Sequence, residues 1–405
     1  MADQNDLIEQ EIRDEIRRAK RAPKRGKKSG GARAVLVLLV LVILAGAAGF
    51  AARKRFGGAD GLRRMFSYSK TQQDADGKAE LFRYDSDRSA TYEALGRSLL
   101  IVSTTRIQLL DAEGRELWAE TVSLTNPAVA LGGKTAAVYD VGGKRLYLVG
   151  ESGFLRDMSA EAQNGVLSAT INASDYLALT TLKSGYRTAV TAYDPAGKPV
   201  FTFNSSERYL TEARVLDDNR QLAAVSLGEA DGVFASTLTF YAFDQEKRVE
   251  EASFSGEMVF ALGSVDGSLA ALEDSCVTLF HKDGSLAGSL RFEYPYLRDV
   301  SFGGNGFAAV LLSRYRSGSA MRLVTFNGEG EALGTLDERR EIVDISAAGK
   351  YVAVLYGDSL TIYTADLSVY QTLDGTEFAR HVSMRADGSA LLLGASHAWL
   401  FGGKS

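Results

Sequence analysis

The sequence predicts an all-β protein: an eight-bladed β-propeller preceded by an N-terminal transmembrane helix, with a seven-bladed ring as the alternative. Three observations lead to this prediction. Residues 34–52 form an uninterrupted apolar run, and short β-type segments separated by Gly-containing turns recur from residue 79 onward. The last of the recurring segments is one strand short, while a single strand stands alone before the first segment. A repeat of about 40 residues that folds into four antiparallel strands is typical of a propeller blade.

The apolar run, residues 34–52, contains no charged, amide or hydroxyl side chain. As a helix it would be about 28 Å long, close to the thickness of the bilayer hydrocarbon core. Eight Lys and Arg residues and no acid precede it in residues 18–33. This basic excess favours a cytoplasmic N-terminus, with the large domain outside the bacterial cell membrane. A cleaved signal peptide is the alternative.

The chain therefore divides into four parts. We expect a basic cytoplasmic tail with a short amphipathic helix (1–33), the transmembrane helix (34–52), a juxtamembrane linker (53–78) and an extracytoplasmic propeller (79–405). The tail helix would lie near the lipid surface or dock to a cytoplasmic partner. A single cysteine excludes an intrachain disulfide, which favours a bacterial exported protein.

The charge is distributed unevenly between the two ends of the chain. Residues 1–78 carry 17 basic and 9 acidic side chains, whereas residues 79–405 carry 29 basic and 42 acidic side chains. The acidic domain would repel nucleic acid and anionic lipid, so we expect no nucleic-acid partner. The basic tail is expected to contact lipid headgroups.

The repeats are punctuated by turns of the form Asp-x-x-Gly. The clearest copies are residues 111–114 and 194–197. Gly supplies the positive φ that a tight hairpin needs. We expect the strand at 79–84 to complete the last, three-stranded segment, which would close the ring and cover two sheet edges. The expected blades are residues 91–121, 126–158, 166–204, 209–255, 257–292, 296–337, 341–373, and 379–401 together with 79–84.

Residues 109–118, LLDAEGRELW, resemble the repeat of pyrroloquinoline-quinone-type and WD40-like propellers. The whole layout resembles an uncharacterised family of membrane-anchored, eight-bladed propellers of Gram-positive bacteria. The matching stretches are the basic tail and apolar run, residues 139–147 (YDVGGKRLY) and residues 229–234 (EADGVF). The resemblance implies the architecture and no activity.

Three loops between second and third strands are longer than the rest, and all three should lie on one face of the ring. Rigid scaffolds often place binding residues on such loops, and Tyr and Arg are enriched at interaction hot spots. The alternative is that each loop is merely polar and solvated. The candidate binding residues are Tyr186 and Arg187 in the third blade, Glu229, Asp231 and Phe234 in the fourth, and Arg314, Tyr315 and Arg316 in the sixth.

No set of catalytic or metal-binding residues stands out. His281, His381 and His397 have no partner at a metal-ligand spacing, and Cys276 is expected to be a buried free thiol. No nucleophile elbow or phosphate-binding glycine loop is present. We therefore expect no metal, no cofactor and no enzymatic activity.

The predicted function is a non-catalytic module that binds or scaffolds a cell-envelope protein or glycan. One alternative is a ligand sensor that relays binding to the cytoplasmic helix. Another is a quinoprotein-like enzyme, but Trp118 and Trp399 are the only tryptophans, and quinoproteins of this class repeat Trp from blade to blade.

Overall fold

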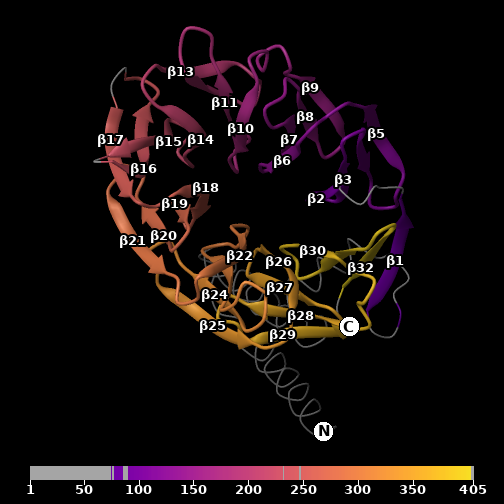
Figure 1. The fold of residues 1–405 in the computed structure, drawn as a ribbon. Coiled ribbons are helices and arrows are strands. Elements are labelled where there is room, and N and C mark those ends of the chain that lie inside the picture. The colour runs from indigo at the N-terminus through magenta and orange to yellow at the C-terminus, as the bar shows by residue number, and fades with distance from the viewer. Residues whose placement is uncertain (1–73, 75–76, 85–89, 231, 246–247, 403–405) are drawn as a thin grey trace, which may run out of the picture. The chain divides into compact units, whose positions relative to one another are not determined.

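The computed structural model describes residue 74 and residues 77–84, 90–230, 232–245 and 248–402. These residues form a ring of eight antiparallel sheets, each with four strands (Figure 1). The prediction of an all-β, eight-bladed propeller is confirmed, and the seven-bladed alternative is wrong. Among the described residues, no helix is long and apolar enough to cross a bilayer. The predicted tail helix and membrane span lie outside the described residues.

Seven blades are made of four consecutive strands each. Blades 1 to 4 are β2–β5 (Thr91–Leu95, Ser98–Val102, Arg106–Leu110, Glu116–Thr121), β6–β9 (Pro127–Leu131, Thr135–Asp140, Leu146–Gly150, Gly153–Asp157), β10–β13 (Val166–Ile171, Leu177–Leu182, Thr188–Tyr193, Pro199–Ser205) and β14–β17 (Tyr209–Val215, Gln221–Ala230, Val233–Ala242, Arg248–Ser255). Blades 5 to 7 are β18–β21 (Val259–Val265, Ser268–Glu273, Cys276–Phe280, Leu286–Arg291), β22–β25 (Tyr296–Ser301, Ala308–Ser313, Met321–Phe326, Ala332–Glu338) and β26–β29 (Ile342–Ala348, Tyr351–Tyr356, Ser359–Thr364, Val369–Asp374).

Blade 8 joins the two ends of the described chain. It contains β30 (His381–Met384), β31 (Ala390–Leu393) and β32 (His397–Phe401), and its outermost strand is β1 (Lys78–Arg83). β1 pairs antiparallel with β32, from Lys78 opposite Phe401 to Arg83 opposite His397. The predicted closure by the isolated strand is therefore confirmed. It removes two open sheet edges at the point where a ring is weakest.

The middle strands of the blades are apolar because both of their faces are covered by neighbouring blades. β3, β19, β23 and β27 are buried along their whole length. The second strand of several blades carries a pair of small residues, which lets neighbouring blades pack closely against both of its faces. These fully buried pairs are Ala136 with Ala137, Ala223 with Ala224, Ala270 with Ala271, and Ala308 with Ala309.

The Asp-x-x-Gly turns close hairpins between third and fourth strands. In the first, Asp111 Oδ1 accepts hydrogen bonds from the backbone N–H of Glu113 at 3.0 Å and of Arg115 at 2.8 Å. Gly114 has φ +78°, which favours glycine. Although partial burial opposes it, the hydrogen bonds from Arg115 and Glu113 lower the pKa of Asp111. The carboxylate therefore stabilises the turn, which explains why an acid precedes each glycine by three positions.

Candidate functional site

The two faces of the ring differ in the kind of connection they carry. The long-loop face holds the loops between second and third strands and the links between blades. The tight-turn face holds the hairpins between first and second and between third and fourth strands. The described chain enters at Lys78 and ends its last strand at Phe401, and both positions lie at the tight-turn face. The long-loop face is thus free of both ends of the described ring.

In blade 3, the loop between β11 and β12 carries Tyr186 and Arg187. The backbone N–H of Tyr186 donates to Lys183 O at 3.1 Å, and its side chain is 48% exposed. The Arg187 side chain donates to Ser206 O at 3.2 Å and lies 5.1 Å from the centre of the Tyr209 ring. Both contacts hold Arg187 against the beginning of the next blade.

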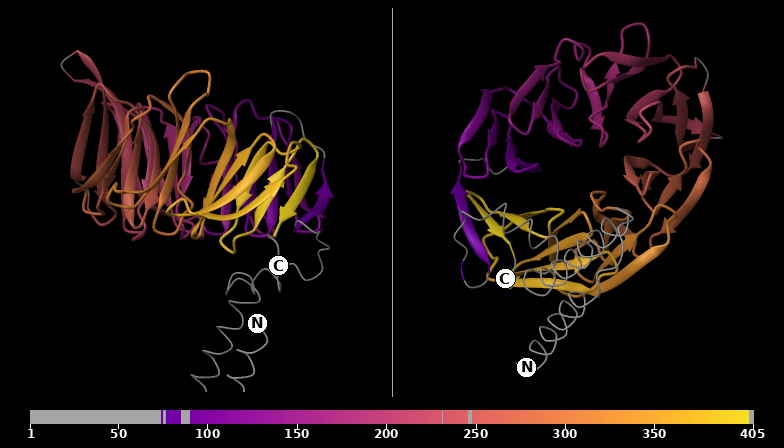
Figure 2. Two further views of the ribbon diagram at one scale, coloured as in Figure 1. Left: turned by 90° about the horizontal axis from the view of Figure 1, so that it is seen from below. Right: turned by 180° about the vertical axis from the view of Figure 1, so that it is seen from behind.

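In blade 4, the predicted long loop at residues 228–235 is instead the tip of a β-hairpin. β15 and β16 continue their pairing to Glu229 opposite Phe234 and Ala230 opposite Val233. A two-residue Asp-Gly turn explains this extension, and Gly232 has the required positive φ of +76°. Asp231 lies outside the described residues. Figure 2 (left) shows this hairpin rising from the ring. Phe234, which pairs with Glu229 next to the tip, is exposed.

In blade 6, the loop between β23 and β24 carries Arg314, Tyr315 and Arg316. Arg298, on β22, donates to the backbone oxygens of Tyr315 at 3.1 Å and Arg316 at 2.6 Å. Ser313 Oγ also donates to Tyr315 O at 2.6 Å. These bonds fix the loop backbone and leave the Tyr315 ring 51% exposed. The loop rises from the same face as the blade 4 hairpin (Figure 2, left).

The predicted residues of blades 3 and 4 are thus on neighbouring blades, but those of blade 6 are separated from them by blade 5. The intervening positions are filled by exposed side chains that the sequence analysis missed: Tyr209, Met258, Phe260 and Tyr296. They occupy the ends of links and the first positions of innermost strands. The sequence did offer a signal for three of them. Tyr209, Phe260 and Tyr296 are large apolar residues at the first or second position of a blade's first strand, next to the links of the long-loop face.

The exposed large apolar side chains are distributed unevenly over the described residues. Leu131 ends β6 at the tight-turn face, and several others lie on outermost strands around the circumference. The largest group lies at the long-loop face, and most of it follows blades 3 to 6. We call the following residues the long-loop patch: Tyr186, Tyr209, Val233, Phe234, Met258, Phe260, Tyr296 and Tyr315.

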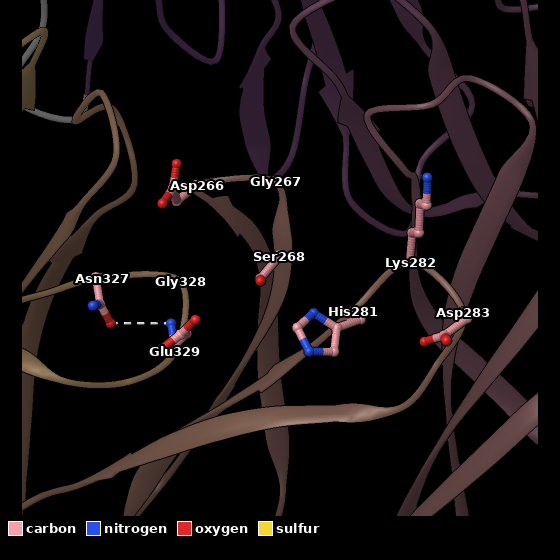
Figure 3. Close-up of a pocket in the computed structure, with 9 residues that line it drawn as sticks. All are labelled: Asp266, Gly267, Ser268, His281, Lys282, Asp283, Asn327, Gly328 and Glu329. Atoms are coloured by element: carbon pink, nitrogen blue, oxygen red, sulfur yellow. Dashed lines mark hydrogen bonds between the residues drawn. The ribbon is translucent and has the colours of Figure 1, made fainter.

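A polar cleft of about 530 Å³ lies at the tight-turn face between blades 5 and 6. Three turns line it, and they contribute Asp266, His281, Lys282, Asp283 and Glu329 together with Gly267, Ser268, Asn327 and Gly328 (Figure 3). The polar groups mainly stabilise their own turns: Asn327 Oδ1 accepts from the backbone N–H of Glu329 at 3.0 Å, and hydrogen bonds from Ser285 lower the pKa of Asp283. Within this cleft no hydrogen bond joins His281 to an acidic side chain.

A central cavity of about 1080 Å³ opens between the hairpins of the tight-turn face. Carboxyl groups on the innermost strands connect adjacent blades. Glu212 accepts a hydrogen bond from Leu262 N–H of the next blade at 2.8 Å, and Asp344 accepts one from Val382 N–H at 2.8 Å. Burial raises the pKa of Glu212 to about 7, and burial together with Asp344 raises that of Glu93 to about 7. These groups support the ring.

The histidines and the cysteine are placed as follows. Asp344 lies 3.6 Å from His381 Nδ1 and raises the pKa of this histidine, a partnership the sequence did not reveal. Cys276 is buried, as predicted. Burial and then Glu273 raise the pKa of its thiol to about 12, so it is not an activated nucleophile.

The fold is similar to several solved propellers. The C-terminal WD40 domain of Sif2 aligns with a TM-score of 0.55 and 12% identity, covering 81% of this chain and 99% of that one. Apo AztD from Citrobacter koseri gives 0.49 and 10%, covering 75% and 94%, and BamB from Moraxella catarrhalis gives 0.48 and 12%, covering 80% and 100%. At such low identity the Sif2 similarity concerns the fold alone. A search of curated proteins finds no significant match.

The sequence itself supplies the family assignment. Residues 69–369, most of the chain from β1 to the first residue of β29, match one protein family. The protein therefore belongs to the family described as "Family of unknown function (DUF5711)".

Proposed function

We propose that this protein is a single-pass membrane protein whose extracytoplasmic propeller captures a protein partner at the long-loop face. The observation that carries the proposal is the long-loop patch, in which exposed aromatic and aliphatic side chains follow four consecutive blades. Exposed apolar side chains that cluster on one surface of a soluble domain usually mark an interaction site. Because a closed ring presents these side chains in a fixed arrangement, little conformational entropy is lost when a partner binds.

The chemistry of this face favours a protein over a glycan. Val233, Met258 and Phe260 offer exposed apolar surface. A glycan bound there would bury hydroxyl groups without hydrogen-bond partners, which is unfavourable. Arg187 is held over Tyr209, and Arg314 lies 5.8 Å from the Tyr315 ring. Tyr and Arg side chains that are already ordered are typical of protein-binding hot spots.

The anchoring part of the proposal rests on the sequence. Residues 34–52 have the length and composition of a membrane helix, and the basic excess before them favours a cytoplasmic N-terminus. Since the described chain enters the ring at the tight-turn face, a tether at Lys78 would not cover the long-loop patch.

We further propose that the propeller acts without catalysing a reaction. In the polar cleft between blades 5 and 6, Asn327 and Asp283 are used as turn caps. The inner-strand carboxyls of Glu212 and Asp344 connect neighbouring blades.

A site-specific crosslinking experiment in living cells tests the proposal. A photoreactive residue is placed in turn at Tyr186, Phe260 and Tyr315, and at the exposed tight-turn positions Lys282 and Glu329 as matched controls. We expect one protein species to crosslink from the three long-loop positions and not from the controls. Crosslinks to glycan only, or equal crosslinking from both faces, would contradict the proposal.

A variant then separates binding from folding. Alanine at Tyr186, Arg187, Tyr315 and Arg316 together should abolish capture of the identified partner. The thermal midpoint should change little, because all four residues are exposed and only Arg187 contacts the next blade through its side chain. The Lys282→Ala, Glu329→Ala double variant should bind normally. Deleting residues 1–30 should also spare binding and function, whereas a sensor that relays to the tail would lose its output.

A further inference from the structure

Blade 5 brings together three side chains, two of them three residues apart in the sequence and the third 16 residues before them. Glu257 lies in the link before β18, Glu273 ends β19 and Cys276 begins β20. The Cys276 sulfur lies 3.2 Å from Glu273 Oε2 and 3.8 Å from Glu257 Oε2. One possible ligand atom from each residue lies within 4.8 Å of the other two.

The two carboxyl groups of this cluster are held in a defined orientation. Thr278 Oγ1 donates to Glu273 Oε1 at 2.5 Å, and Ser275 Oγ donates to Glu257 Oε1 at 2.9 Å. Each hydroxyl therefore binds the Oε1 atom of its carboxyl group, and the Oε2 atom faces the sulfur. This arrangement matches metal sites, where hydrogen bonds from neighbouring side chains orient the carboxylate ligands.

The cluster also places two carboxyl groups side by side in a largely buried position. Glu273 is only 2% exposed, and Glu257 is half-buried beside it. Within the described part of the chain, neither carboxylate forms an ion pair. Arg291 lies opposite Cys276 on β21, and its charge contributes to lowering the pKa of Glu257 after the hydrogen bonds that Glu257 receives. Buried carboxylates are normally paired with a cation or bound to a metal.

We propose that Glu257, Glu273 and Cys276 bind a divalent transition-metal ion of the zinc class. In a tetrahedral zinc site, bonds of about 2.3 Å to sulfur and 2.0 Å to oxygen place sulfur and oxygen about 3.5 Å apart. The two sulfur–oxygen distances in blade 5 lie on either side of this value. The thiolate ligand favours zinc over calcium and magnesium, which take oxygen ligands.

A metal ion at this site would also connect the long-loop face to the interior of blade 5. Glu257 belongs to the link that also carries Met258, next to Phe260, so a bound ion would tie this part of the long-loop face to the two middle strands of blade 5. Three protein ligands leave a fourth position for water or for a ligand atom of a partner, and half-buried Glu257 provides access from solvent. This inference does not depend on the proposed function.

Cobalt binding to the full-length protein in detergent tests the inference. The protein is stripped with a chelator and titrated with Co²⁺, and zinc is then added to displace it. Because Cys276 is the only cysteine of the chain, any thiolate-to-cobalt charge-transfer band reports this residue. We expect one equivalent to bind with such a band, zinc to displace it, and zinc to raise the thermal midpoint.

Variants assign the signal to the three ligands. Cys276→Ser should abolish the band. Cys276→Ser and Glu273→Gln should each weaken zinc binding at least about 10-fold, since even losing a residue that only orients a ligand costs about 10- to 100-fold in metal affinity. Asp274→Asn is the matched control: it removes an exposed neighbouring carboxylate that contacts none of the ligands, and it should bind zinc nearly as well as the wild type.

Three results would overturn the inference: no charge-transfer band in folded wild-type protein, equal zinc affinity in Cys276→Ser, or an equal loss in Asp274→Asn. In the first case the thiol only donates hydrogen bonds to the carboxyl groups. Circular dichroism establishes that each variant is folded. Should Glu273→Gln fail to fold, Glu257→Gln at the half-buried position replaces it in the comparison.

Discussion

The dependence of stability on pH offers a direct check of how the carboxyl group of Glu212, on the innermost strand β14, is held. Glu212 connects blade 4 to blade 5 through its bond to Leu262 N–H, and burial raises its pKa from 4.5 to about 7. In the unfolded chain the group keeps the lower value. The stability associated with the protonated form is therefore complete below about pH 4.5 and is lost as the pH rises toward 7. The gap between the two pKa values corresponds to about 3 kcal/mol.

Replacing Glu212 by Gln isolates this contribution. Gln keeps an acceptor for Leu262 N–H and carries no charge, so Glu212→Gln and the wild type should have similar free energies of unfolding near pH 4. By about pH 8 the variant should be more stable by up to about 3 kcal/mol, since the wild type must then hold a buried carboxylate. Urea unfolding of the full-length protein across this pH range measures the difference.

The control is Glu250→Gln on the exposed outermost strand β17, where no widening with pH is expected. A constant difference between Glu212→Gln and the wild type would refute the reasoning. So would a variant that is less stable than the wild type at pH 8, because this would show that Glu212 is ionised and held by the neighbouring Arg214.

Three further predictions follow from individual contacts. Tyr84→Phe removes the buried hydrogen bond of 2.6 Å to Gly394 O where the ring closes, and should cost about 1 kcal/mol in urea unfolding; an unchanged midpoint would contradict it. Arg298→Gln should free the backbone of the β23–β24 loop and weaken partner capture while the thermal midpoint stays nearly constant, and normal capture would show that the order of this loop does not matter. Phe326→Ala opens a cavity between blades 5 and 6 and should cost about 3–5 kcal/mol; a loss below 1 kcal/mol would mean that the neighbouring blades collapse into the space.

The architecture of the ring could be predicted because its determinants are local. Apolar strands alternate with short turns all along the repeats, and hairpins between neighbouring strands need no distant information. Closure was also predictable, since the strand at Lys78–Arg83 and the incomplete last blade complement each other. The assignment of loops to faces followed from the number of strands per blade alone.

The parts that could not be predicted depend on register and on contacts around the ring. The blade 4 hairpin was interpreted as a loop because Gly228 and Gly232 interrupt its pattern, yet pairing continues to Ala230 and Val233. To predict that Glu257 and Glu273 converge on Cys276, one must know how the link before β18 runs relative to β19 and β20. No spacing in the sequence encodes that path.

The same physics explains why the two faces differ in what they can do. On the tight-turn face, polar side chains such as Asp111 and Asn327 are engaged by their own turns, so a substitution there costs stability before it changes recognition. On the long-loop face, the loops are fixed by backbone contacts such as those of Arg298, and the outward side chains of Tyr186 and Tyr315 contribute little to folding. Such side chains can change without unfolding the ring. A partner surface can therefore be built on the long-loop face at low cost in stability, which is the physical reason to expect the binding function there.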